Sequence, residues 1–219
     1  YEPNVTLTYG TLTLQKDKDY TVVYKNNLNA GPATVALKGW GNYTGETTKN
    51  FVIAQKNIAA DMVFVAPETV VYNGELQKPV VTVTDAERNV VLTEGVDYTL
   101  TNDGGENVGS YAVMVVGCGN YTAAPAVLKT FTITPAEIAV VNVAEIEQPV
   151  TGELLDVDAV FEAEGVDAIS AVNWTPAAAD GVAEGETVYT ASVELTNNSN
   201  YVFADNVVAY VNGEAATAT

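Results

Sequence analysis

The sequence predicts an all-β protein built from several small β-sandwich modules. Twelve tyrosines, with abundant Val, Thr, Asn and Gly, favour pleated strands joined by tight turns over helices. Apolar and polar residues alternate over short stretches, and turn-forming residues separate these stretches. An internal repeat relates residues 19–53 to residues 97–133. Short strands at this spacing are typical of sandwiches and barrels.

Three motifs of the first copy recur 78 residues later. They are Asp19-Tyr20-Thr21 and Asp97-Tyr98-Thr99, Asn29-Ala30-Gly31 and Asn107-Val108-Gly109, and Gly39-Trp40-Gly41-Asn42-Tyr43-Thr44 and Gly117-Cys118-Gly119-Asn120-Tyr121-Thr122. Two extra residues in the stretch 123–126 then raise the offset to 80, so Phe51 corresponds to Phe131 and Ile53 to Ile133. We expect this insertion to lie in a loop.

The second copy is the more complete of the two. Alternation predicts strands over residues 69–72, 79–84, 96–101, 110–116 and 128–134. The first copy has nothing that matches residues 62–72, so we expect it to begin within the repeat and to lack its opening strands. A sandwich without these strands exposes an unpaired edge, which favours aggregation unless something covers it.

A different module is expected after Pro135, because the Gly-x-Gly-Asn-Tyr-Thr motif does not recur there. Alternation still predicts strands over residues 137–143, 168–174, 188–195 and 206–211. The predicted modules are therefore 1–55, a partial repeat; 56–136, a complete repeat; and 137–219, a distinct acidic module. Joins of only a few residues, near Gln55 and Ala136, predict a stiff string of modules.

The charge of the chain excludes one class of partner. The formal net charge is −19, and all nine Lys and Arg lie between Lys16 and Lys129. Such a field repels nucleic acid and anionic lipid, so we expect no nucleic-acid partner and assign the charge to solubility.

No apolar run reaches the roughly 18 residues of a membrane helix, so we expect no membrane insertion in this segment. Tyr1 is not a natural start, and any export signal is expected upstream.

The chain offers little for catalysis. It has no histidine, which removes the commonest general base and transition-metal ligand, and the lone Cys118 has no partner for an internal disulfide. None of the 28 acidic residues lies in a recurring catalytic context. We therefore expect no enzyme, no catalytic residue, no tightly bound metal and no cofactor.

Two weak candidate sites can be weighed against simpler roles. Asp156 and Asp158 are two residues apart, which on a strand places both carboxylates on one face, as a calcium site needs; solvated acids are the simpler reading. Trp40, at a loop tip, and Tyr43 could stack on a sugar ring. The simpler role of Trp40 is packing at the edge of its sandwich, and Cys118 replaces it in the second copy.

The first two copies resemble the immunoglobulin-like and MBG/YDG-type repeats common in large bacterial surface proteins. The resemblance rests on Tyr72-Asn73-Gly74, Gly95-Val96-Asp97-Tyr98, Asn107 to Tyr111, Gly117 to Thr122 and Phe131-Thr132-Ile133. Residues 137–219 look like another repeat of such proteins, through Trp174-Thr175-Pro176 and Tyr201-Val202-Phe203. The resemblance implies tandem immunoglobulin-like β-sandwiches in an extracellular stalk, adhesin or spacer at a bacterial cell surface.

The sequence is compatible with two functions. The first is a non-catalytic spacer or interaction segment, with other surface proteins or host components as partners. The alternative is a series of carbohydrate-binding modules that present loop aromatics to glycans. A glycan array with a Trp40→Ala variant would separate them.

Overall fold

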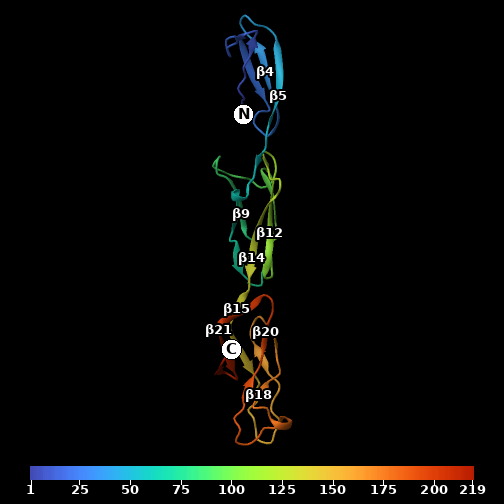
Figure 1. Cartoon of the computed structure of the whole chain (residues 1–219), viewed down its shortest axis with the longest axis vertical. Coiled ribbons are helices and arrows are strands. Elements are labelled where there is room, and N and C mark those ends of the chain that lie inside the picture. The colour runs from blue at the N-terminus through green and yellow to red at the C-terminus, as the bar shows by residue number, and fades with distance from the viewer. The chain divides into compact units, whose positions relative to one another are not determined.

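The computed structural model describes every residue from Tyr1 to Thr219 and is all-β, as predicted (Figure 1). It has 22 strands and two 3₁₀ turns, Ala60–Met62 and Ala179–Gly181, and no α-helix. The chain forms two compact units. Unit 1 comprises Tyr1–Pro67, Lys78–Asp103 and Ala112–Phe131, and unit 2 comprises Glu68–Gln77, Gly104–Tyr111 and Thr132–Thr219. The second predicted module contributes to both units, and the division into three modules stays a prediction.

The first copy contributes five strands to unit 1. These are the hairpin of β1 (Thr8–Tyr9) and β2 (Leu12–Thr13), and an antiparallel sheet with the order β3 (Tyr20–Lys25), β4 (Gly31–Gly39) and β5 (Glu46–Ile53). Figure 1 shows β4 and β5 side by side in the blue part of the chain. No strand is formed by residues 1–7.

The second copy forms two sheets whose strands lie mainly in unit 1. One sheet has the order β10 (Val90–Val91), β9 (Val80–Asp85) and β7 (Val63–Ala66). In the other, β12 (Gly109–Gly117) lies between β11 (Tyr98–Asn102) and β14 (Val127–Thr134). A third, two-stranded parallel pair joins β6 (Lys56–Asn57) to β13 (Tyr121–Thr122).

The two copies share strand register and loop hydrogen bonds. Tyr20 lies opposite Gly39 in the first copy, and Tyr98 lies opposite Gly117 in the second. The carboxylate of the preceding residue, Asp19 or Asp97, accepts a hydrogen bond from the backbone N–H four residues earlier, at 2.8 and 3.0 Å. Tyr20 is 3% exposed and Tyr98 5%. The two tyrosines thus occupy equivalent, buried positions, as expected from the internal repeat.

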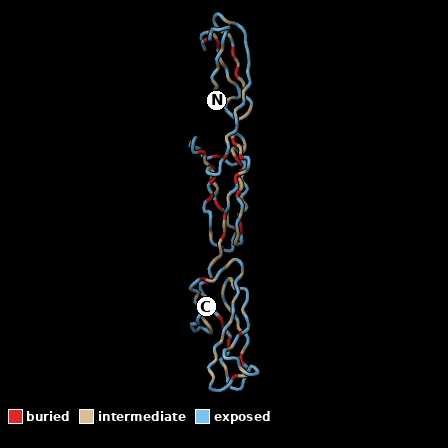
Figure 2. The backbone as a smooth tube through the Cα atoms, viewed as in Figure 1, coloured by how far each residue is buried: buried red, intermediate tan, exposed pale blue.

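The core of the second copy lies between its two sheets. Val63 and Val83, from one sheet, belong to the same buried cluster as Tyr98, Val115 and Val127, from the other. Alternation places every second side chain of a strand in this core. Figure 2 shows the result as short red, buried stretches that interrupt the paler, exposed ones along the chain.

Unit 2 contains the end of β14 and the remaining strands. Residues Thr132 to Thr134 of β14 pair in parallel with β8 (Thr69–Val71). A four-stranded sheet has the order β16 (Val160–Glu162), β15 (Ala136–Ala144), β21 (Tyr201–Val211) and β22 (Glu214–Ala216). Two antiparallel pairs complete the unit: β17 (Val166–Ile169) with β20 (Leu195–Asn197), and β18 (Asn173–Thr175) with β19 (Thr190–Ser192). Its buried cluster is centred on Ile138, Val141 and Val143 of β15.

Some predicted strands differ from those observed. The stretch 168–174 is interrupted, because β17 ends at Ile169 and β18 begins at Asn173. The predicted strand 96–101 begins only at Tyr98, because Gly95 has a φ of 78° and Val96 donates a turn hydrogen bond to Thr93 at 3.2 Å. Strand β7 lies within residues 62–72, where opening strands were expected, but only residues 69–72 of this stretch were given as a strand.

Candidate interaction sites at the junctions and in the first copy

Asn120 connects the second copy to the first within unit 1. It lies in the Gly-x-Gly-Asn-Tyr-Thr turn that follows β12. Its side-chain Oδ1 accepts a hydrogen bond from the backbone N–H of Ala30 at 2.7 Å, and its Nδ2 donates to Oδ1 of Asn29 at 3.1 Å. Asn29 and Ala30 belong to the turn between β3 and β4. The donor and the acceptor of this amide therefore both bind the neighbouring copy.

Asn200 makes the same bridge within unit 2. Its Oδ1 accepts a hydrogen bond from the backbone N–H of Val108 at 2.9 Å, and its Nδ2 donates to Oδ1 of Asn107 at 3.0 Å. Asn107 and Val108 are the counterparts of Asn29 and Ala30 in the internal repeat. Asn200 thus has the role of Asn120, although the third predicted module lacks the Gly-x-Gly part of the motif.

The backbone beside each bridging asparagine holds the strand that connects the modules. The carbonyl of Asn120 accepts a hydrogen bond from Lys56 N at 3.0 Å, and the carbonyl of Asn200 accepts one from Ala136 N at 3.0 Å. In both places the next residue is a tyrosine in a parallel strand pair: Tyr121 lies opposite Lys56, and Tyr201 lies opposite Ala136. One residue therefore binds the preceding module through its side chain and the connecting strand through its backbone.

Each of these tyrosines donates to a carboxylate. Tyr121 Oη donates to Asp85 Oδ2 at 3.1 Å, and Tyr201 Oη donates to Glu164 Oε1 at 2.6 Å. Burial, followed by the bond to Asp85, raises the pKa of Tyr121. The hydrogen bond to Glu164 is the main cause that raises the pKa of Tyr201 to about 12. Both hydroxyls therefore remain protonated donors at neutral pH.

Asp85 is the one buried charged residue of the chain, at 1% exposure. Its Oδ1 accepts hydrogen bonds from Lys56 Nζ at 2.7 Å and from Arg88 N at 3.2 Å. The hydrogen bond from Lys56 is the main cause that lowers the pKa of Asp85. Lys56 also pairs with Glu87 at 2.7 Å, and the two carboxylates raise the pKa of Lys56. The pair ties the connecting strand β6 to the sheet that contains β9.

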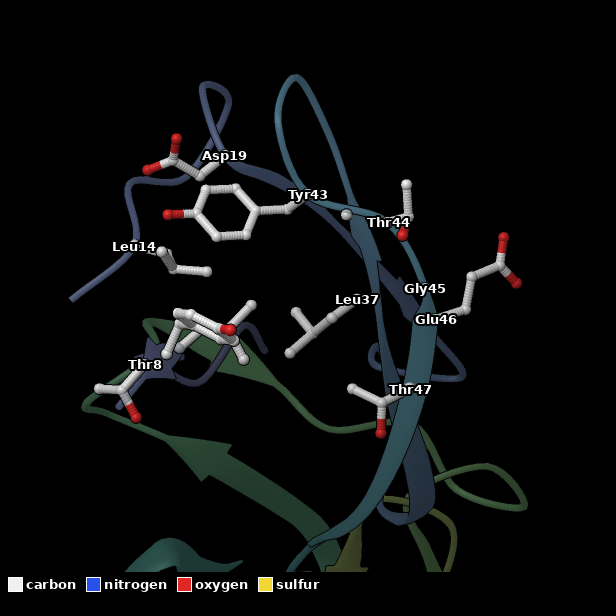
Figure 3. A pocket seen from close by; sticks show the side chains of 12 residues that line it. Thr8, Leu14, Asp19, Leu37, Tyr43, Thr44, Gly45, Glu46 and Thr47 are labelled. Atoms are coloured by element: carbon white, nitrogen blue, oxygen red, sulfur yellow. The ribbon is translucent and has the colours of Figure 1, made fainter. Parts of the chain in front are cut away.

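The corresponding end of the first copy has neither a bridge nor a tyrosine–acid pair. Asn42, the counterpart of Asn120, is exposed and makes no hydrogen bond with its side chain. Leu7 stands where the second copy has Asp85. Beside it lies an open pocket of about 280 Å³, lined in part by Leu7, Leu14, Leu37 and Tyr43. Figure 3 shows Leu14, Leu37 and Tyr43 pointing toward this hollow, while Glu46 points away from it.

Trp40 and Tyr43, the two residues predicted as glycan-binding candidates, have different surroundings in the structure. Trp40 is 59% exposed and does not line the pocket, whereas Tyr43 does. The aromatic neighbour of Tyr43 is Tyr9, with ring centroids 6.2 Å apart and an interplanar angle of 64°. Tyr9 also lines the pocket, and sequence reasoning had not selected it.

The two predicted calcium candidates lie in the loop between β15 and β16, not on a strand. Asp156 Oδ2 accepts a hydrogen bond from Glu147 N at 2.9 Å, and its Oδ1 accepts one from Asp158 N at 3.0 Å. These bonds, the one from Glu147 first, lower the pKa of Asp156. Both of its oxygens thus organise the loop, and Asp158 is exposed. No group of three or more Cys, Asp or Glu residues could hold a metal ion.

The bridging asparagines were missed as functional residues, although the sequence contains a signal for them. The dipeptide Asn-Tyr occurs at 42–43, 120–121 and 200–201, once in each predicted module. The third occurrence lies outside any recognisable Gly-x-Gly motif, so the spacing of the repeat did not reveal it.

Comparisons with known proteins give no relative for this chain. No family model, no curated protein and no solved structure matches it. The structure has no helix with the length and apolar character needed to cross a membrane.

Proposed function

We propose that the chain is a non-catalytic modular segment of a bacterial cell-surface or secreted protein. Its modules are tandem immunoglobulin-like β-sandwiches, and they act as a spacer or as adhesin-like interaction modules toward other surface proteins or host components. The observation that carries this proposal is the asparagine bridge, which is built twice from corresponding residues.

The bridge suits a spacer because it limits motion between consecutive modules. A flexible linker would let the modules reorient freely, and the distance that they span would then vary. Here the connecting strand is itself paired, and two hydrogen bonds from one amide fix the turn of the preceding module. Each of these hydrogen bonds contributes about 1 kcal/mol to stability, so several weak interactions together hold the junction.

The test is whether the first two copies tumble as one body. ¹⁵N relaxation of the whole chain gives a rotational correlation time for each copy. We expect equal values in the wild type and a shorter value for the first copy in Asn120→Ala. Asn42→Ala is the matched control, because it changes the same residue of the same motif where no bridge exists. Unequal correlation times in the wild type, or no difference between the two variants, would count against a docked spacer.

Carbohydrate binding is the second candidate, and the exposure of Trp40 favours it. A tryptophan that is 59% exposed at a loop tip offers a flat apolar face for a sugar ring. A glycan array should then show binding by the wild type and at least a tenfold loss in Trp40→Ala. If the wild type binds no glycan on the array, carbohydrate binding is ruled out as its function.

A further inference from the structure

The tripeptide Asn-Gly-Glu occurs twice in unit 2, at residues 73–75 and at residues 212–214. Both copies lie at exposed positions. Neither Gly74 nor Gly213 donates its N–H to a backbone carbonyl, and no atom beyond the neighbouring residues lies within 4 Å of the place that a Cβ would take at either glycine. In sequence and in exposure the two sites are therefore alike.

The side-chain amides of the two asparagines are bonded in opposite ways. Asn73 Oδ1 accepts a hydrogen bond from the backbone N–H of Glu75 at 3.0 Å, which forms an Asx turn, and its Nδ2 donates to no protein group. Asn212 instead donates from its Nδ2 to the carbonyl of Ile146 at 2.7 Å. The folded structure thus holds the amide oxygen at one site and the amide nitrogen at the other.

This difference matters for one reaction of Asn-Gly pairs, the attack of the glycine nitrogen on the asparagine Cγ. The Asx turn closes a ring that contains both Cγ of Asn73 and the nitrogen of Gly74, so it keeps the two atoms close. The hydrogen bond to Oδ1 also draws electron density from Cγ, which makes this carbon a better electrophile. The leaving group of Asn73, its Nδ2, is not restrained.

At Asn212 the same attack is opposed. Its amide must first break the hydrogen bond to Ile146 before it can turn toward Gly213. The backbone N–H of Asn212 donates to the carbonyl of Val143 at 2.9 Å, and Glu214 pairs with Val211 in the hairpin of β21 and β22. Each restraint that must be released adds to the barrier, and about 1.4 kcal/mol slows a reaction tenfold.

The loop that contains Asn73 is anchored on both sides. Tyr72 N donates to the carbonyl of Thr134 at 2.8 Å, next to the parallel pairing of β8 with β14. On the other side, Gln77 Nε2 donates to the carbonyl of Val71 at 3.0 Å. Residues 73–76 between these anchors are all exposed. The reaction at Asn73 therefore requires no unfolding of the strands beside it.

We propose that Asn73 is a site of spontaneous deamidation in the folded protein and that Asn212 is protected from it. The nitrogen of Gly74 bonds to Cγ of Asn73, the bond from Cγ to Nδ2 breaks, and the proton of the glycine nitrogen leaves with Nδ2 as ammonia. Water then opens the succinimide ring at either carbonyl, which gives aspartate or isoaspartate. The product adds a negative charge to the loop after β8. This inference does not depend on the proposed spacer function.

The experiment follows both sites in the full-length chain during incubation in mildly alkaline buffer, by peptide mapping with mass spectrometry. In the folded chain we expect Asn73 to react about tenfold faster than Asn212 or more, since only Asn212 must release hydrogen bonds first. In concentrated urea the two sites should react at similar rates, because both are Asn-Gly-Glu. Asn73→Gln should abolish the fast release of ammonia, and the matched control Asn212→Gln should leave it unchanged.

Three results would overturn the proposal. The first is a rate at Asn73 no greater than that at Asn212 in the folded chain. The second is the same ratio of rates in urea, which would place the cause in the neighbouring sequence rather than in the fold. The third is fast release of ammonia that persists in Asn73→Gln, which would assign the reaction to another residue.

Discussion

Tyr98 and Trp40 are large aromatic residues in very different surroundings. Tyr98 is 5% exposed and packs in the same cluster as Val83 and Val115, and burial raises the pKa of its hydroxyl. Trp40 is 59% exposed. The contribution of an aromatic side chain to stability follows mainly the apolar area that it removes from water.

Tyr98→Ala should therefore lower the free energy of unfolding by about 3 kcal/mol, as other large-to-small core substitutions do. Trp40→Ala should lower it by less than about 1.5 kcal/mol, because most of the indole is already in contact with water. Denaturant unfolding of both variants measures the difference. A larger loss for Trp40→Ala than for Tyr98→Ala would contradict the assignment of Tyr98 to the core and of Trp40 to the surface.

Asp85 makes a pH-dependent contribution to stability. Because Lys56 lowers the pKa of Asp85 in the folded state, the ionised carboxylate stabilises the fold fully above the unfolded-state value of about 4. This contribution is lost as the pH falls through the lowered folded-state pKa. The melting temperature of the wild type should thus fall more steeply below about pH 4 than that of Asp85→Asn.

Asp61→Asn is the matched control for this titration, because Asp61 is an exposed carboxylate in the same module. Its melting temperature should fall below about pH 4 as steeply as that of the wild type. If the melting temperature of Asp85→Asn falls as steeply as well, the Lys56–Asp85 pair does not produce the acid sensitivity.

At the scale of elements, the Gly-x-Gly turn has a steric cause. A Cβ atom at Gly117 would lie 2.4 Å from the carbonyl carbon of Thr122, and one at Gly39 would lie 2.9 Å from the backbone of Thr44. The second glycine of each motif has a positive φ, 64° at Gly41 and 59° at Gly119. The first glycine therefore permits close approach of two backbones, and the second permits the turn.

Gly117→Ala should destabilise the protein by about 1–3 kcal/mol, because the added methyl overlaps backbone atoms that cannot move independently. Gly109→Ala is the matched control at the other end of β12, where the nearest atom to an added Cβ is 3.7 Å away. Thermal melts of both variants measure the loss of stability that each substitution causes. Equal losses would show that flexibility of glycine, rather than close contact, explains the motif.

How far the elements could be predicted depends on the local pattern. Strands β9, β12 and β14 were predicted to within two residues, because they alternate in sequence and end at turn-forming residues or, for β14, at Pro135. The bounds of β7 were not predicted because its sequence, Val-Phe-Val-Ala, is apolar throughout, with no alternation in type to mark its two faces. The asparagine bridges were not predictable from local pattern, because each joins residues about 90 positions apart. The pairing of Lys56 with buried Asp85 was also hidden, because it joins residues of different strands that are 29 positions apart.

For the whole molecule, the dominant electrostatic feature is the unbalanced charge after Lys129. From Thr130 onward the chain has 15 Asp and Glu and no Lys or Arg. These carboxylates repel one another at neutral pH, and physiological salt screens the repulsion over about 8 Å. Trp174 reports on this region, since its Nε1 donates to the carbonyl of Asp156 at 2.6 Å.

Monovalent salt should therefore raise the melting temperature of the third module modestly, and calcium should do no more than magnesium at equal ionic strength. Fluorescence melts of the Trp40→Phe variant, in which Trp174 is the remaining tryptophan, measure both effects. Stabilisation by calcium well beyond magnesium would instead show a specific site near Asp156 and Asp158.

The asparagine bridge is the feature that we propose to hold consecutive modules together. The direct measurement is the distance distribution between spin labels at Lys49→Cys and Thr99→Cys, both exposed, in a Cys118→Ser background. We predict one narrow distribution for this protein, an equally narrow one after Asn42→Ala, and a clearly broader one after Asn120→Ala. A broad distribution before any asparagine is changed, or the same width for Asn120→Ala as for Asn42→Ala, would contradict the claim.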